Sequence, residues 1–213
     1  MAVRTVLFDL DGTLIDSHHL IIASFRHACR QVLGREITDE HAQVRWGQPL
    51  GVRFAAVAPD CVPALVDAYA QYYDRHERTL ASVFPGVPEL LAALAGRACA
   101  IGVVTSKRGR AAAQALRVLG LAPWITTSVG AEDAPAPKPA ADPIRVALRR
   151  LEAVPESSLM VGDAPFDLQA ARAAGVRSAA ALWGARDIET LLACAPDYVA
   201  RSPGDVALIV ESA

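Results

Sequence analysis

Short apolar runs alternate with helical segments along much of this chain, and this alternation constrains its fold most. The runs are nearly continuous in apolar or small residues, which suits strands buried on both faces of a parallel sheet. They span residues 100–104, 125–129 and 158–161, and runs at 5–8 and 177–182 extend the same sheet. The helical segments end close to glycines and span residues 88–94, 109–119, 142–151 and 166–174. The pattern predicts an α/β fold with a doubly wound parallel sheet.

A long interval separates the first predicted strand from the second. Within it, apolar residues recur at helical spacing over residues 17–33 and 61–80. We therefore expect a small helical cap inserted at residues 16–82, with an α/β core formed by residues 1–15 and 83–213. The cap should close over the site as a lid and supply substrate contacts. Its core should include four aromatic side chains, Trp46, Tyr69, Tyr72 and Tyr73. The tail from Ile188 should mix a short helix with loops.

The composition limits the partners of the chain. Its 21 Lys and Arg nearly balance its 23 Asp and Glu, so no overall field attracts nucleic acid or an anionic membrane. The four cysteines lie too far apart for a compact disulfide framework and fit a reducing compartment. No segment has the length and apolarity of a signal peptide or a membrane-spanning helix. We expect a cytoplasmic monomer or homodimer that acts on a small molecule.

Two acidic pairs follow predicted strands. Asp9 and Asp11 follow the run at 5–8, and alternation along an extended segment allows both side chains to lie on one side. Asp163 follows the run at 158–161, with Asp167 four residues further on. Ligands of open parallel sheets bind beyond the carboxyl ends of the strands, where these carboxylates should converge. Two such charges about 4 Å apart repel by roughly 4 kcal/mol at an effective dielectric of 20, so protons or a divalent cation must neutralise them.

The expected ion is Mg²⁺, because the ligands are carboxylates and all five histidines lie in the insertion. Thr105 and Ser106 follow the run at 100–104 and precede a helix, where hydroxyl and N–H groups can hold a phosphate oxygen. Lys138, followed by Pro139, can place an ammonium over the carboxylates and the anion. The sequence thus predicts an anion site beside a metal site.

These segments resemble the four motifs of the haloacid dehalogenase superfamily, which has a Rossmann-like core. The resemblance spans the whole chain, and residues 7–25 and 46–50 are similar to the phosphoglycolate phosphatase and pyrophosphatase branch. It implies that Asp9 attacks phosphorus and becomes an aspartyl phosphate. It also implies that Asp11 protonates the leaving oxygen and then activates the hydrolytic water. The four motifs are residues 9–13, residues 105–106, residues 138–139 and residues 162–167.

The same resemblance implies a role for each remaining motif residue. Asp9, the backbone carbonyl of Asp11 and Asp163 would hold the magnesium. Asp167 would orient Lys138 or a metal-bound water. The transferring phosphoryl group would be bound by Thr105, Ser106 and Lys138, and the ligands would be supported by Gly12, Thr13 and Gly162. Two departures from the family pattern are Ala164, in place of a frequent hydroxyl, and residues 134–137, in place of a more usual glycine.

The resemblance implies a magnesium-dependent phosphatase acting on a small phosphorylated metabolite. Phosphoglycolate is the first expectation and inorganic pyrophosphate the nearest alternative. Arg45, Gln48 and Arg53 in the insertion are candidates for holding a second anionic group of the substrate. A phosphomutase of the β-phosphoglucomutase kind shares the motifs, whereas a dehalogenase does not need the acid–base group of Asp11. A receiver-type domain also accepts phosphate on an aspartate, but such domains lack an insertion of this kind.

Overall fold

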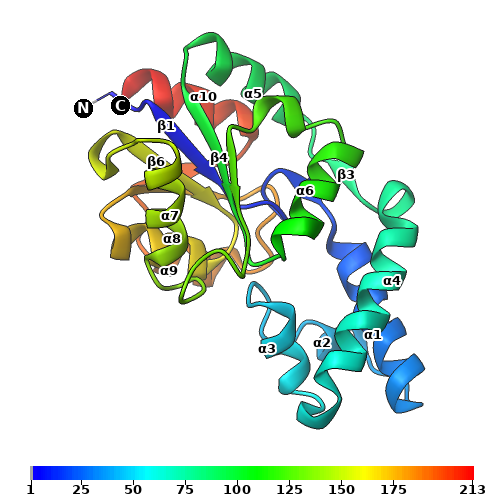
Figure 1. The fold of residues 1–213 in the computed structure, drawn as a ribbon. Helices are drawn as coiled ribbons and strands as arrows, with labels where there is room; N and C mark the ends of the chain where they lie inside the picture. Colours follow the sequence, from blue (N-terminus) through cyan, green and yellow to red (C-terminus); the bar gives the residue numbers. More distant parts are fainter. Residues whose placement is uncertain (1) are drawn as a thin grey trace. The chain divides into compact units, whose positions relative to one another are not determined.

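The structure is a computed structural model that describes residues 2–213 (Figure 1). The chain forms two compact units, one from the chain up to Asp16 and from Val83 onward, the other from Ser17–Ser82. The inserted unit therefore begins one residue after the expected boundary at residue 16. None of the described helices is long and apolar enough to cross a membrane.

In the described part of the chain, the first unit contains a six-stranded parallel sheet with the strand order β5-β4-β1-β6-β7-β8. The central strand β1 pairs with β4 on one side and β6 on the other, with Thr5 opposite Ala100 and Ser158. This confirms the doubly wound fold. The strands are β1 (Thr5–Phe8), β4 (Ala100–Val104), β5 (Thr127–Val129), β6 (Ser158–Gly162), β7 (Arg177–Ala181) and β8 (Tyr198–Ala200).

Helices cover both faces of this sheet (Figure 1). Side chains alternate along β1, so Val6 and Phe8 pack with α5, α6 and α10 while Leu7 packs with α7 and α8. Burial on both faces explains why the strands read as continuous apolar runs. The helices of this unit are α5 (Val87–Gly96), α6 (Gly109–Val118), η2 (Ala122–Trp124), α7 (Asp142–Arg150), η3 (Pro155–Ser157), α8 (Pro165–Ala174), α9 (Ile188–Ala193) and α10 (Pro203–Ser212).

Two predictions about this unit were wrong in part. The strand expected at 125–129 begins only at Thr127, because Ala122–Trp124 form a 3-10 turn that ends at Trp124, inside the loop before the strand. The tail is more regular than expected, since it contains the edge strand β8 and the helix α10 as well as the short helix α9. The start of α10 is fixed by Asp205, whose carboxylate accepts hydrogen bonds from the backbone N–H groups of Arg201 and Ser202.

The inserted unit is helical, as expected, and its two long helices α1 and α4 pack against each other. Phe25 and Phe54 stack at its centre, with ring centroids 4.2 Å apart. Trp46, Tyr69 and Tyr73 join a second apolar cluster, whereas Tyr72 stacks on His76. The helices of this unit are α1 (His18–Leu33), α2 (Asp39–Ala42), α3 (Leu50–Ala55), η1 (Pro59–Cys61) and α4 (Val62–Leu80). The short strands β2 (Ile15–Asp16) and β3 (Ser82–Val83) form a separate two-stranded sheet.

Candidate active site

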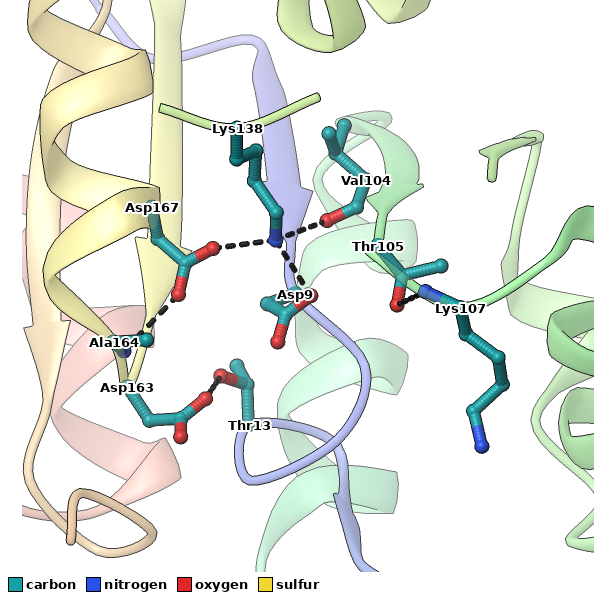
Figure 2. A network of polar contacts seen from close by, with 9 residues as sticks. All are labelled: Asp9, Thr13, Val104, Thr105, Lys107, Lys138, Asp163, Ala164 and Asp167. Atoms are coloured by element: carbon teal, nitrogen blue, oxygen red, sulfur yellow. Dashed lines mark hydrogen bonds and ion pairs between the residues drawn. The ribbon is translucent and has the colours of Figure 1, made fainter. Parts of the chain in front are cut away.

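Three carboxylates meet at the carboxyl edge of the sheet. Asp9 follows β1 directly, Asp163 follows β6, and Asp167 lies in the first turn of α8. One oxygen of each lies within 4.8 Å of the others (Figure 2). The convergence follows from topology, since β1 and β6 are parallel neighbours that end at the same edge.

Lys138 reaches this cluster through the loop between β5 and α7 (Figure 2). Its ammonium donates to Oδ1 of Asp9 at 2.8 Å, to Oδ1 of Asp167 at 2.5 Å and to the carbonyl of Val104 at 3.0 Å. An ammonium has three N–H donors, so these contacts use all of them. The second oxygen of Asp167 accepts from the N–H of Ala164 at 3.0 Å. Asp167 therefore contacts Lys138 directly, and its expected role in orienting this lysine stays a prediction.

The cluster shifts the proton affinities of its members. Burial is the main cause that raises the pKa of Asp9 from 3.8 to about 7, against the opposing effect of Lys138. Burial, together with the charges of Asp9 and Asp167, raises the pKa of Asp163 well above its ordinary value. Burial opposes the charged form of Lys138, but the carboxylates of Asp167 and Asp9 outweigh it and raise its pKa. Without a cation, burial therefore favours the protonated forms of Asp9 and Asp163.

The turn after Asp11 packs against the carboxylate of Asp163 and holds it by a hydrogen bond. The hydroxyl of Thr13 donates to Oδ1 of Asp163 at 2.8 Å. Gly12 has φ +89°, and a Cβ at this position would lie 2.3 Å from Oδ2 of the same carboxylate. Glycine is required at residue 12 both for this backbone conformation and for the close approach. Gly162 is similarly confined, because a Cβ there would lie 2.3 Å from Cβ of Asp167.

The loop after β7 also contacts this turn. The indole N–H of Trp183 donates to the carbonyl of Thr13 at 2.9 Å. A Cβ on Gly184 would lie 1.8 Å from the carbonyl oxygen of Gly12. Sequence analysis missed both residues, although their position after the carboxyl end of β7 was a usable signal. The hydrogen bond from Trp183 and the close backbone approach at Gly184 place this loop against the turn beside Asp163.

Asp11 lies beside a second lysine that sequence analysis also missed. The ammonium of Lys107 is 3.3 Å from Oδ1 of Asp11, and the two side chains are 11% and 19% exposed. Lys107 follows Thr105 and Ser106 in the loop after β4, and its N–H donates to Oγ1 of Thr105 at 3.2 Å. The backbone N–H of Thr105 donates to Val129, so the hydroxyl is the group that Thr105 can offer an anion.

The N–H groups expected near the anion site are in part engaged by the protein itself. Helix α6 begins at Gly109, three residues after Ser106. The N–H of Gly109 donates to the carboxylate of Glu132 at 3.1 Å, so the first N–H of this helix is already engaged by the protein. Nearby, Asp133 accepts from the N–H of Gly130 and pairs with Arg150, which anchors the segment leading to Lys138.

Among the candidate substrate-binding residues of the insertion, Arg53 is buried within the inserted unit. Arg53 is 5% exposed, and its guanidinium donates to the carbonyls of Ala42 and Val44 within its own unit. It also lies over the rings of Phe25 and Trp46, 5.0 and 5.1 Å from their centroids. These contacts give Arg53 a structural role in the inserted unit.

Arg45 and Gln48 belong to one turn. The N–H of Gln48 donates to the carbonyl of Arg45, which has φ +50°. Oε1 of Gln48 is buried and accepts no hydrogen bond from the described residues. A substrate role for either side chain stays a prediction.

The donor set of the carboxyl edge fits a magnesium ion. Oδ2 of Asp9 and Oδ2 of Asp163 take part in none of the hydrogen bonds described for residues 2–213, whereas both oxygens of Asp167 are engaged. Hard carboxylate oxygens with raised proton affinity are suitable ligands for Mg²⁺. Asp9 and Asp163 are therefore the best candidate ligands, and the backbone carbonyl of Asp11 stays a predicted third.

Comparisons with known proteins agree with this geometry. A family model described as haloacid dehalogenase-like hydrolase matches residues 6–181. The pyrophosphatase PpaX of Oceanobacillus iheyensis is 31% identical over 99% of this chain and 98% of its own length. A relative from Caldanaerobacter subterraneus subsp. tengcongensis, which also carries the name PpaX, is 37% identical over 93% and 90%. The solved structure of a haloacid dehalogenase-like family hydrolase from Streptococcus pneumoniae is 29% identical, has a TM-score of 0.86 and covers 97% of this chain and 98% of its own.

Proposed function

Because this chain belongs to the haloacid dehalogenase-like hydrolase family, we propose that it is a magnesium-dependent phosphatase working through an aspartyl phosphate on Asp9. One observation carries the proposal. Asp9 directly follows the central strand, and its buried carboxylate is held through Oδ1 by Lys138 and lies beside Asp163. Phosphoryl transfer depends on positioning and charge neutralisation, and this arrangement can supply both.

In the first step, a carboxylate oxygen of Asp9 attacks phosphorus as the bond from phosphorus to the leaving oxygen breaks. Asp11 donates its proton to that leaving oxygen, so the product departs protonated. Lys138 holds Asp9 in one orientation during the attack, and the hydroxyl of Thr105 is available to a phosphoryl oxygen. Ser106 is a further proposed phosphoryl contact.

In the second step, water attacks the phosphorus of the aspartyl phosphate. The carboxylate of Asp11 accepts a proton from this water, and the bond between phosphorus and the Asp9 oxygen breaks to release inorganic phosphate. Asp11 is thereby protonated again and Asp9 is regenerated. A bound Mg²⁺ would neutralise charge among the carboxylates and the phosphoryl oxygens. Asp9 and Asp163 would hold it, with Thr13 and Gly12 fixing the position of Asp163.

Inorganic pyrophosphate is the first candidate substrate. Two relatives that match nearly the whole chain, at 31% and 37% identity, both carry the name pyrophosphatase PpaX. This supports placing pyrophosphate before phosphoglycolate. Phosphoglycolate, the first expectation from the sequence, becomes the second candidate. Both substrates transfer a phosphoryl group from a leaving group that is itself an anion.

The test measures phosphate release from pyrophosphate and phosphoglycolate, with and without Mg²⁺. Wild-type chain should release phosphate only with the ion and, after acid quenching, should carry a hydroxylamine-sensitive phosphoryl label. Asp9→Asn should remove both signals while keeping the fold by circular dichroism, because the amide is not a nucleophile. Asp67→Asn, at an exposed position of α4, is the matched control and should retain both. Turnover by the Asp9 variant would overturn the mechanism.

A further inference from the structure

Lys107 is a largely buried cation of the site that the two chemical steps above do not use. Its side chain is 11% exposed, and its ammonium lies 3.3 Å from Oδ1 of Asp11. A charge withdrawn from water in this way acts more strongly on its neighbours than a surface charge does. Its function depends on which part of a substrate would lie beside it.

We propose that Lys107 selects substrates whose leaving group carries a negative charge of its own, such as a phosphate or a carboxylate. The inference rests on the proposed function, in which Asp11 donates a proton to the leaving oxygen. A cation within 3.3 Å of that carboxylate lies at the leaving-group end of the substrate. A second anionic group there would receive a charge-assisted hydrogen bond from the ammonium.

Lys138 is not suited to this task. Its three N–H donors are directed at Asp9, Asp167 and the carbonyl of Val104. Figure 2 shows Lys138 and Asp167 to one side of Asp9 and the side chain of Lys107 to the other. The two lysines therefore have different roles. Lys138 neutralises the carboxylate cluster, and Lys107 binds the leaving group.

Hydrogen bonds fix the backbone of Lys107, whereas its side chain can change conformation. Its N–H donates to Oγ1 of Thr105, and its carbonyl accepts from the N–H of Ala131 at 2.9 Å. The 3.3 Å ion pair with Asp11 is longer than the 2.8 and 2.5 Å contacts of Lys138. A lysine side chain carries a point charge on a flexible stem, so the ammonium can meet an anion beside Asp11 without a backbone change.

The experiment compares kcat/KM for charged and neutral leaving groups. In pyrophosphate and phosphoglycolate the leaving group already carries an anionic group of its own, whereas in 2-hydroxyethyl phosphate and p-nitrophenyl phosphate it carries none before the ester bond breaks. 2-Hydroxyethyl phosphate differs from phosphoglycolate only by an alcohol in place of the carboxylate. Lys107→Met should lower kcat/KM for the charged pair on the order of 10- to 100-fold more than for the neutral pair, the range expected for a hydrogen bond between charged groups. Lys107→Arg should restore the preference, because it keeps the charge.

The control is Arg108→Met, which removes the same charge from the exposed neighbouring residue and should change all four substrates alike. Equal losses on the charged and neutral pairs in Lys107→Met would overturn the inference and assign Lys107 to holding Asp11 alone. Such a result would leave the proposed function intact. Absence of phosphate release from all four substrates by wild-type chain would instead overturn the proposed function and this inference with it.

Discussion

The ammonium of Lys138 lies 2.5 Å from Oδ1 of Asp167, and the two side chains are 3% and 1% exposed. Desolvation of both charges offsets much of the attraction in such a buried pair, so the pair itself contributes little net stability. The loss of one partner is different, because it leaves the other charge buried and partly uncompensated. Since Lys138 also holds Asp9, the pair links α8 to the proposed nucleophile.

Asp167→Asn should therefore lower the free energy of unfolding by about 3 kcal/mol, as measured by urea denaturation. The matched control is Asp133→Asn, whose partner Arg150 is 41% exposed. Because this ion pair is accessible to water, its loss should lower the free energy of unfolding by about 1 kcal/mol or less. Similar losses in the two variants would show that Lys138 does not depend on Asp167 for its charge balance.

Gly184→Ala should reduce both activity and magnesium affinity. Its new Cβ would lie 1.8 Å from the carbonyl oxygen of Gly12, a backbone atom that can move only if the turn moves. The turn includes Thr13, whose hydroxyl holds Asp163. Calorimetric titration with Mg²⁺ checks the affinity. Gly96→Ala is the control, since nothing lies within 4 Å of a Cβ there, and unchanged affinity in both variants would contradict the prediction.

Asp11→Asn should slow phosphate release strongly but retain Mg²⁺ binding, because Asp11 is proposed to use only its backbone carbonyl as a ligand. General acid–base catalysis typically contributes about 10²- to 10⁴-fold, and the loss of turnover should fall in this range. Asp163→Asn provides the comparison, because it removes a proposed ligand and should weaken binding in the same titration. Loss of Mg²⁺ affinity as the main effect of Asp11→Asn would assign its side chain to the metal instead.

Much of this site followed from strand ends alone. Asp9 and Asp163 each come directly after a buried strand, and neighbouring parallel strands end at one edge, so their meeting needed no knowledge of side-chain contacts. The partner of Asp11 could not be predicted this way. Lys107 lies in a loop, where side-chain direction has no period, and its distance from Asp11 is known only from the folded structure.

Two other features escaped prediction for different physical reasons. Strand β8 has only three residues and an exposed Val199 at its centre, so it lacks the continuous apolar run of the inner strands. Arg53 was a candidate for substrate binding because it flanks the segment 46–50 of the insertion, and the alternative was a solvated charge on a helix. Its guanidinium is instead buried over Phe25 and Trp46, and the contact with Phe25 joins residues far apart in sequence.

Arg53→Met should destabilise the protein through the inserted unit. The change leaves the carbonyls of Ala42 and Val44 without the N–H groups that they accept from Arg53, at a cost of about 1–3 kcal/mol for each group left unsatisfied. Arg35→Met, which removes an exposed guanidinium with a 3.5 Å contact to Val57, is the control and should change stability by less. Thermal unfolding measures both variants. An unchanged stability with a selective loss of one substrate would return Arg53 to substrate recognition.

Without divalent ions, the protein should lose stability as the pH rises from about 4 to 7. Burial raises the pKa of Asp9 to about 7, whereas an aspartate of the unfolded chain titrates near about 3.9. The folded state thus retains a proton that the unfolded chain has released, so its contribution to stability is full below about pH 4 and lost through about pH 7. The raised pKa of Lys138 keeps this group charged throughout, so it adds no slope.

Magnesium should reverse this dependence, since the ion binds carboxylates and competes with protons. The expected rise in Tm on adding Mg²⁺ is therefore larger at about pH 8 than at about pH 5. Thermal unfolding in EDTA and in excess Mg²⁺ across this range measures both effects. Asp9→Asn is the diagnostic variant, because it removes one of the two carboxyls with a raised pKa and should reduce the slope in EDTA. A wild-type slope that is flat or rises with pH in EDTA would mean that Asp9 is ionised without a cation, and that Lys138 alone neutralises it.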